Sequence, residues 1–449
     1  MSTVNTGIVG GHAQGQARPL PMVMNSISVI GGKVATMGLG FLFWLLAART
    51  FTQAEVGLAA GAVSAMMLCT QLAALGVGSA LITRYPEHIR QPRQLLDNAF
   101  TITSATALLV AGGALVLASL SLHQLAILSH SVAFATFFLL ACLTGTLGIV
   151  LDQASIALRR GDQVLLRGLA FGAVTVASLG AIAWWTSASG AMFIFLPWVG
   201  AGIAACLIGA WQLHRALAGY GYRPRMSRET SRDLIAVGLP NWALTMTERA
   251  PGLLLPVVVT EVLSPTDNAA WYAAWMMAWV LFVIPISVGL TLFAEATHRP
   301  DKLRRAVTLG IGCALAIGVV GGLAMAALAP YLLSLLGKTY AAAGTEPLRI
   351  LLLSVVPLAF TQAYFAICRS RRRLGEAIVV GVVSAVVSVV AAAIGGATNG
   401  LDGIALAWTI TQTVTGLVSL HRIRAMWRAT PDASPSNLAT TVVRRSPVD

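Results

Sequence analysis

Long apolar runs separated by short polar segments make up most of this chain. A transmembrane helix needs roughly 20 predominantly apolar residues. Uncharged runs of suitable length lie at 57–83, 99–122, 131–151, 168–186, 190–213, 268–294, 306–337, 350–368, 377–399 and 403–420. Two further apolar stretches carry charge: residues 22–48 contain Lys33, and residues 234–260 contain Glu248 and Arg249. The pattern therefore predicts an all-α polytopic membrane protein with twelve transmembrane helices.

The composition agrees with this pattern. Of 449 residues, 57% are hydrophobic and only 10% are charged, whereas about a quarter of the residues in a soluble domain are charged. A soluble enzyme, a disordered chain and a fibrous protein are all disfavoured. The 30 basic residues outnumber the 17 acidic ones. In a soluble protein this excess would suggest nucleic acid; here it reflects topology, and no nucleic-acid partner is expected.

The distribution of basic residues predicts the orientation, because Lys and Arg gather in cytoplasmic loops. With the N-terminus inside, 25 of the 30 fall in the two tails and the cytoplasmic loops. The opposite loops hold three: Arg49, Lys338 and Arg349. A missed or invented helix would disrupt this alternation. The bias therefore supports twelve helices with both ends on the cytoplasmic side.

The two halves of the chain resemble each other. An offset of 209 aligns residues 152–172 with 361–381 at six identities, and an offset of about 212 aligns 52–61 with 264–275. We expect a cytoplasmic tail at 1–21, an N-lobe of six helices at 22–213, a basic linker at 214–233, a C-lobe at 234–427 and a disordered tail at 428–449. Six is an even number, so the lobes share one orientation and are related by an axis along the membrane normal.

Intramembrane charges are the first candidates for function, since a charge at mid-bilayer costs about 2.5–3.5 kcal/mol and tends to face a cavity or a partner. Lys33 and Arg249 lie near the middle of corresponding helices, because the offset of 212 places Lys33 opposite Thr245. They could meet an anionic substrate between the lobes. The alternative is structural, with Glu248 neutralising Lys33 across the lobes or Arg249 snorkelling within its bundle.

The helix at 234–260 is also interrupted by Gly and Pro, as helices at transporter binding sites often are. Asn241 and Thr245, one turn apart, would add hydrogen-bonding groups there. Glu248 is a candidate for coupling or gating. Asp152, beside Arg159 and Arg160, is a weaker candidate for which a surface salt bridge is favoured.

Other chemistry lacks support. The five cysteines are scattered and the histidines lie in loops, tails or helix ends, so no metal site or disulfide framework is indicated. Phosphate-loop, HExxH and GxSxG motifs are absent, so we expect no cofactor and no enzymatic activity. Two GxxxG spacings, Gly57–Gly61 and Gly168–Gly172, permit close helix contact, although such spacings are common in a chain with 43 glycines.

Three stretches resemble the polysaccharide (lipid-linked oligosaccharide) flippases of the multidrug/oligosaccharidyl-lipid/polysaccharide (MOP) exporter superfamily. They are FLFWLLAARTFTQAEVGLAAGAVSAMMLCTQLAALGVGSAL (41–81), SIALRRGDQ (155–163) and LLGKTYAAAGTEPLRILLLSVVP (335–357), the last similar to that family's connection between helices 9 and 10. The resemblance implies two pseudo-symmetric, MATE-like lobes in a bacterial cytoplasmic membrane. It also implies alternating-access transfer of an undecaprenyl-pyrophosphate-linked oligosaccharide, with Lys33, Arg49 and Arg249 holding the pyrophosphate.

The partners implied are the lipid-linked substrate, membrane lipids, and glycan polymerase or other export machinery. Two rivals remain open. One is a cation-coupled multidrug exporter of the same fold, which would have an acid-lined cavity. The other is a membrane-embedded glycan-assembly enzyme, for which the short outer loops offer little room.

Overall fold

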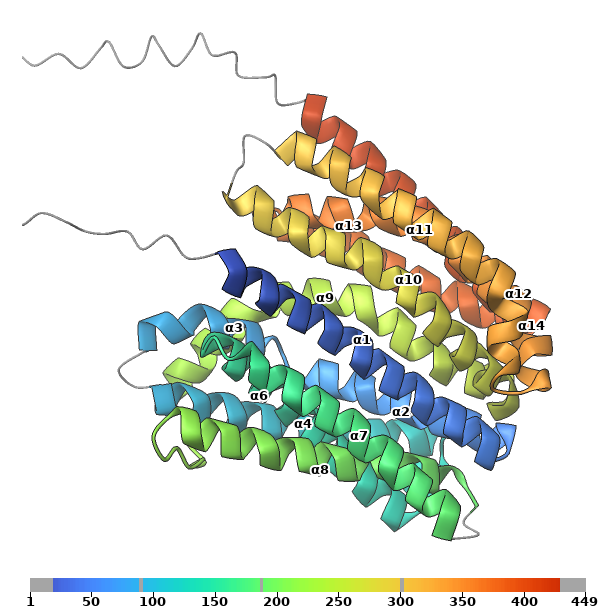
Figure 1. Cartoon of the computed structure of the whole chain (residues 1–449), viewed down its shortest axis with the longest axis horizontal. Helices are drawn as coiled ribbons and strands as arrows, with labels where there is room; N and C mark the ends of the chain where they lie inside the picture. Colours follow the sequence, from blue (N-terminus) through green and yellow to red (C-terminus); the bar gives the residue numbers. More distant parts are fainter. Residues whose placement is uncertain (1–18, 89–91, 186–188, 299–302, 429–449) are drawn as a thin grey trace, which may run out of the picture.

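A computed structural model describes residues 19–88, 92–185, 189–298 and 303–428, and side chains from Ala35 onward except at 294, 296–298 and 303. Every element in these ranges is a helix (Figure 1). The elements are α1 (Pro19–Thr50), α2 (Gln53–Ala73), α3 (Val77–Arg84), η1 (Tyr85–His88), α4 (Pro92–Ser121), α5 (Ile127–His130), α6 (Val132–Ala157), α7 (Gly161–Trp185), α8 (Ala191–Ala216), α9 (Arg228–Val262), α10 (Pro265–His298), α11 (Leu303–Ser334), α12 (Lys338–Leu352), α13 (Val355–Ser370) and α14 (Leu374–Arg428).

Each predicted span coincides with a helix or a helix pair. Eight described helices are long and apolar enough to cross a membrane, and the pair α12–α13, bent by 46°, makes a ninth. The longest, α14, is two helices joined at a kink at Asn399 and Gly400. The charged helices α1 and α9 complete the twelve. The predicted all-α, twelve-helix fold in two lobes is confirmed.

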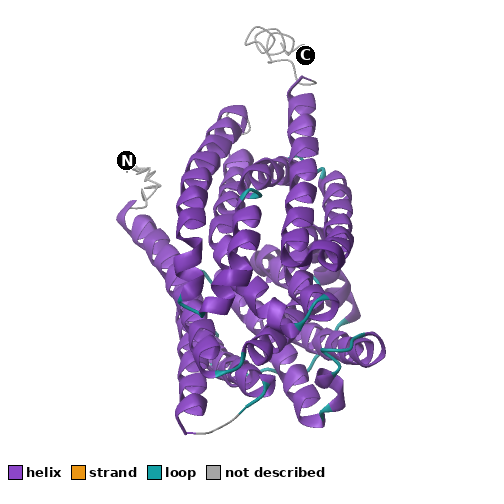
Figure 2. Ribbon diagram, turned by 90° about the vertical axis from the view of Figure 1, so that its right-hand side faces the viewer, coloured by secondary structure: helices purple, strands orange, loops and turns teal. Residues whose placement is uncertain are grey.

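The start of α1 and the end of α14 lie at the same end of the molecule, as an even number of crossings requires (Figure 2). We call this the inner end and the opposite one the outer end. Two local features differ from the expected pattern. Helix α9 begins at Arg228, so it extends into the predicted linker at 214–233. Residues 338–348, expected as part of an outer connection, belong to α12.

The internal repeat has structural counterparts. At the offset of 212, Thr52 and Ser264 both cap helices: the Thr52 hydroxyl accepts from the Glu55 amide (3.4 Å) and the Ser264 hydroxyl from the Asp267 amide (3.1 Å). Such caps satisfy amides that have no partner in a helix's first turn. Packing repeats too, because α1 lies on α7 as α9 lies on α14, and α4 on α6 as α11 on α13.

A second matched pair lies near the inner end. At the offset of 209, Ser155 corresponds to Tyr364 and Arg167 to Glu376. Arg167 donates to the Ser155 hydroxyl (3.1 Å), and Tyr364 donates to the Glu376 carboxylate (3.0 Å). A hydrogen bond between corresponding positions thus joins the fourth and fifth helices of both lobes, although the residue types and the direction of donation differ.

Glycines bring the lobes together. Gly57 and Gly61 on α2 face the C-lobe: a Cβ on Gly57 would overlap the Pro265 carbonyl, and one on Gly61 would lie 2.8 Å from the Thr260 hydroxyl. The amide of Asn268 donates to the Gly57 carbonyl at 2.7 Å. The other GxxxG pair acts within the N-lobe, where a Cβ on Gly172 would lie 2.8 Å from Leu39 on α1. Both spacings therefore permit close helix contact.

Candidate functional site

The seam between α2–α3 and α9 joins the lobes from the outer end to the inner end. In its middle, the Trp242 indole donates to the Gln71 carbonyl at 2.8 Å. Nearer the inner end, Gly76 lies directly against Gly238, where any side chain on either residue would overlap the partner backbone. Gly76 also has φ 71°, a left-handed backbone conformation that favours glycine, so its conformation as well as its close contact requires this residue.

The outer ends of the lobes are also joined. The Glu261 carboxylate at the end of α9 accepts from the backbone amides of residues 123, 124 and 125 in the N-lobe, at 2.8, 3.2 and 2.8 Å. Gln53 donates to the Thr266 carbonyl at 3.1 Å. On the opposite seam, the Trp44 and Tyr272 rings lie 4.8 Å apart. The described structure is therefore closed at its outer side.

Arg49 belongs to this outer closure. Its guanidinium Nε donates to the Leu335 carbonyl at 2.8 Å, which links the end of α1 to the end of α11. Arg249 lies thirteen residues before the end of α9, so about 20 Å further in at 1.5 Å per residue. The structure does not bring Arg49 and Arg249 to one depth.

Asn241, Thr245 and Arg249 lie along one face of α9, because residues four apart nearly superpose on a helix. This stripe runs between the α9 face that contacts the N-lobe, with Gly238 and Trp242, and the face turned into the C-lobe. Asn241 and Arg249 are exposed, and the Thr245 hydroxyl donates to the Asn241 carbonyl at 2.9 Å. The three predicted residues therefore share one surface beside the lobe seam.

Among the residues whose side chains are described, none forms a hydrogen bond or ion pair with the exposed guanidinium of Arg249. Lys33, its predicted counterpart, belongs to α1, but its side chain lies outside the described residues. The meeting of these two cations stays a prediction.

Glu248 faces the other way. Its carboxylate pairs with Arg369 on α13 at 2.8 Å, and the two side chains are only 15% and 11% exposed. Arg369 was expected in a cytoplasmic loop, but it reaches back into the C-lobe. Glu248 therefore has its counter-ion within its own lobe, and the second carboxylate oxygen is buried with no hydrogen-bond partner among the described residues.

Glu248 also borders a cavity of about 50 Å³ inside the C-lobe. Besides aromatic rings of α10 and α14, hydroxyl and amide side chains line it: Thr247, Thr361, Gln362, Ser384, Gln412 and Thr415. A space of this size holds one or two water molecules. It is too small for an oligosaccharide or a drug.

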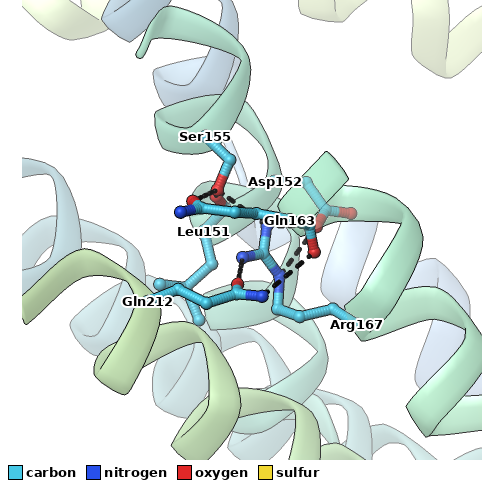
Figure 3. Close-up of polar contacts among 6 residues, drawn as sticks. All are labelled: Leu151, Asp152, Ser155, Gln163, Arg167 and Gln212. Atoms are coloured by element: carbon cyan, nitrogen blue, oxygen red, sulfur yellow. Dashed lines mark hydrogen bonds and ion pairs between the residues drawn. The ribbon is translucent and has the colours of Figure 1, made fainter. Parts of the chain in front are cut away.

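Asp152 lies in an N-lobe polar cluster that Figure 3 shows. Its carboxylate pairs with Arg167 of α7 at 2.8 Å, and not with Arg159 or Arg160. Arg167 also donates to Gln212 of α8, and its side chain is only 4% exposed. The expected surface salt bridge is therefore a partly buried one.

Sequence reasoning missed Arg167 because it assigned this residue to a cytoplasmic loop. The four-residue spacing of Gln163 and Arg167 could have indicated a polar helix face, because both side chains contact Ser155 of α6 in the structure. The cluster ties α6, α7 and α8 of the N-lobe together.

Solved structures match this arrangement. An inward-facing multidrug resistance MATE family transporter of the MOP superfamily has a TM-score of 0.69 at 17% identity, covering 88% of this chain and 96% of that one. The chain has the MATE fold. The lipid II flippase MurJ, in an inward closed conformation, has a TM-score of 0.69 at 13% identity, covering 90% and 87%. A MOP superfamily transporter from Pyrococcus furiosus has a TM-score of 0.63 at 15% identity, covering 91% and 96%.

No family model and no curated protein matches the sequence. At these identities the likeness establishes the MATE fold alone. It confirms the fold implied by the resemblance of residues 41–81, 155–163 and 335–357 to MOP-superfamily flippases.

Proposed function

We propose that this protein is a flippase that moves an undecaprenyl-pyrophosphate-linked oligosaccharide across the bacterial cytoplasmic membrane. The observation that carries the proposal is Arg249. Its guanidinium is exposed at mid-helix beside the lobe seam and has no partner among the described residues. An unpaired intramembrane cation is costly, which is accounted for if an anionic substrate is its partner.

The chemistry of the stripe suits a pyrophosphate. A guanidinium donates two parallel hydrogen bonds to phosphate oxygens. The Asn241 amide, two turns along the stripe, would add a donor for the substrate, and the Thr245 hydroxyl would donate to it only by giving up its bond to the Asn241 carbonyl. Lys33 would supply a second cation from the N-lobe. Arg49 would act later, because its bond to Leu335 must break before the outer side opens.

The closed outer side is the starting state of the proposed cycle. Substrate enters from the inner leaflet, the pyrophosphate binds the stripe, and the lobes then rock to open outward. The membrane potential, worth about 2.3 kcal/mol per charge per 100 mV, would help drive a charged substrate. Glu248, neutralised by Arg369, and Asp152, neutralised by Arg167, would hold their lobes rigid during this motion.

The test is reconstitution of the full chain in liposomes that carry a lipid-linked pyrophosphate oligosaccharide, with outward transfer scored by an impermeant glycosidase. Arg249→Ala should lower transfer at least tenfold, whereas Arg249→Lys should retain part of it. Arg228→Ala, at the inner end of the same helix, is the control and should transfer normally. Normal transfer by Arg249→Ala would refute the assigned role.

A cation-coupled multidrug exporter is the alternative on the same fold. The acidic group in the C-lobe cavity is the one observation that favours it, although Arg369 already neutralises Glu248. Drug efflux from cells expressing the protein, lost in Glu248→Gln and retained in Arg249→Ala, would favour the exporter.

A further inference from the structure

Helix α9 is divided between the apolar cores of the two lobes. Its inner part, residues 228–238, packs in the N-lobe: Leu234 is fully buried there, and Ile235 and Val237 pack against the same apolar cluster. The other buried members of this cluster belong to α3, α4, α6, α8 and the segment that precedes α9. Leu244, two turns after Val237, instead belongs to a cluster formed with α10, α11, α13 and α14. By its packing, the boundary between the lobes therefore lies inside α9.

Polar contacts hold the same inner part of α9 to the N-lobe. Asp233 pairs with Arg84 at the end of α3 at a distance of 2.7 Å. The backbone amide of Ser227, the N-cap of α9, donates to the side-chain oxygen of Asn98 on α4 at 2.6 Å. Asn98 is itself fully buried. The start of α9 is thus fixed to the N-lobe by an ion pair and a hydrogen bond as well as by packing.

One helical hydrogen bond is missing where the two parts of α9 meet. Pro240 lies within the helix and has no N–H to donate to the preceding turn, which favours a kink. Gly238 lies directly against the backbone of Gly76, so no side chains interlock at this contact. The hydrogen bond from Trp242 to Gln71 lies one turn beyond it, where a rotation about the contact produces little displacement. The sequence and packing at this point suit a hinge.

We propose that α9 bends between residues 238 and 244 when the lobes move, and that residues 228–238 move with the N-lobe. The contact between α3 and the start of α9 then stays closed in both states. Separation of the lobes at the inner end is confined to the rest of their boundary. The inference rests on the lobe movement of the proposed function, but not on the identity of the substrate.

Distances between spin labels test which lobe carries the start of α9. Pairs of labels are placed on the full chain without its native cysteines, at exposed positions on three helices: Ile156 on α6, Arg232 on α9 and Val379 on α14. Each pair is measured in lipid nanodiscs with and without Gly57→Leu, whose added side chain would overlap the Pro265 carbonyl in the closed outer state. The 156–379 and 232–379 distances should both shift, whereas the 156–232 distance should stay the same.

Two substitutions at one exposed residue test the position of the hinge. Pro240→Ala restores the backbone donor and stiffens the helix, so most of the shift in the 232–379 distance should be lost. Pro240→Gly restores the same donor but leaves the backbone flexible, so the shift should persist. The glycine variant is the matched control, because neither substitution adds volume at this position.

A shift in the 156–232 distance with a constant 232–379 distance would overturn the proposal, since the start of α9 would then move with the C-lobe. Three constant distances would also overturn it, because α9 would not bend. A full shift in Pro240→Ala would contradict the assigned position of the hinge. These distances do not depend on substrate transfer, so failure of the proposed substrate in the liposome assay is a separate result.

Discussion

Glu248 and Arg249 are neighbours in sequence, yet the first is paired inside the C-lobe and the second is exposed beside the lobe seam. Adjacent helical residues point about 100° apart, so the sequence could predict that they separate. It could not predict the partner of Glu248, because Arg369 lies 121 residues away. The distribution of basic residues along the chain assigned Arg369 and Arg167 to cytoplasmic loops. In the structure both side chains instead pair with carboxylates of neighbouring helices.

The Glu248–Arg369 pair gives a stability prediction. Removing one partner of a buried ion pair leaves an uncompensated charge and costs about 3–5 kcal/mol. Glu248→Ala should therefore lower the Tm of the purified protein clearly. The charge-reversed double variant Glu248→Arg with Arg369→Glu should recover a large part of the loss. Equal destabilisation of the double variant and the sum of the single variants would show that the two side chains do not interact.

Glu55 gives a pH prediction at the outer end. Burial raises the pKa of this carboxyl, but hydrogen bonds from the Thr52 amide and hydroxyl and from the Gly190 amide outweigh burial, so the pKa lies below its ordinary value. A carboxyl whose pKa is lowered in the folded protein stabilises the fold at pH values above the ordinary glutamate pKa of about 4.3. This stabilisation is lost as the pH falls through the lowered pKa.

Hydrogen exchange should therefore show faster opening of the Thr52 and Gly190 amides, which donate to the Glu55 carboxylate, below about pH 4. Glu55→Gln keeps the side-chain shape but cannot titrate. Its exchange at these two amides should not respond to carboxyl protonation, and an unchanged pH response in this variant would assign the effect to another group.

At the scale of helices, the sequence predicted where the spans lie but not how they bend. The apolar run at 57–83 is two helices, α2 and α3, because Leu75 and Gly76 adopt positive φ between them. A glycine such as Gly76 indicates a possible break of this kind in the sequence, whereas a leucine such as Leu75 does not. The run at 350–368 is likewise divided, and its first residues belong to the amphipathic α12. Apolar length alone cannot reveal such breaks.

The Gly57 face of α2 supports a prediction about conformation. Its backbone contacts Pro265 so closely that no side chain fits in the closed outer state. Gly57→Leu should therefore favour separation of the outer ends, measured as greater reactivity of a cysteine at residue 53 toward an impermeant maleimide. Gly113→Leu on α4, where a side chain meets nothing within 4 Å, is the control. Unchanged reactivity in Gly57→Leu would show that the lobes do not separate there.

At the scale of the molecule, the twelve helices, the two lobes and the repeat could be predicted because each depends on patterns that run along the chain. The candidate site could be predicted only in part. Asn241, Thr245 and Arg249 share a face because helical spacing requires it. The family resemblance assigned Arg49 to the pyrophosphate, and that role stays a prediction; in the described structure its guanidinium donates to the Leu335 carbonyl in the outer closure. Which charges meet across the lobes is decided by tertiary packing.

The outer closure offers the most direct test of alternating access. Gln53 and Thr266 lie in different lobes and are joined by one hydrogen bond of 3.1 Å at the outer end. If transport requires the lobes to part there, a covalent link between these positions must stop it. In a background without the five native cysteines, Gln53→Cys with Thr266→Cys should cross-link on oxidation or with a short bismaleimide.

Transfer of substrate in liposomes should then fall to the background of protein-free vesicles, and reduction of the disulfide should restore it. Each single-cysteine variant controls for the substitutions themselves, and a cysteine pair at residues 112 and 113 of α4 controls for the reagent. Normal transfer by the cross-linked protein would mean that substrate leaves without separation of the α2 and α10 ends.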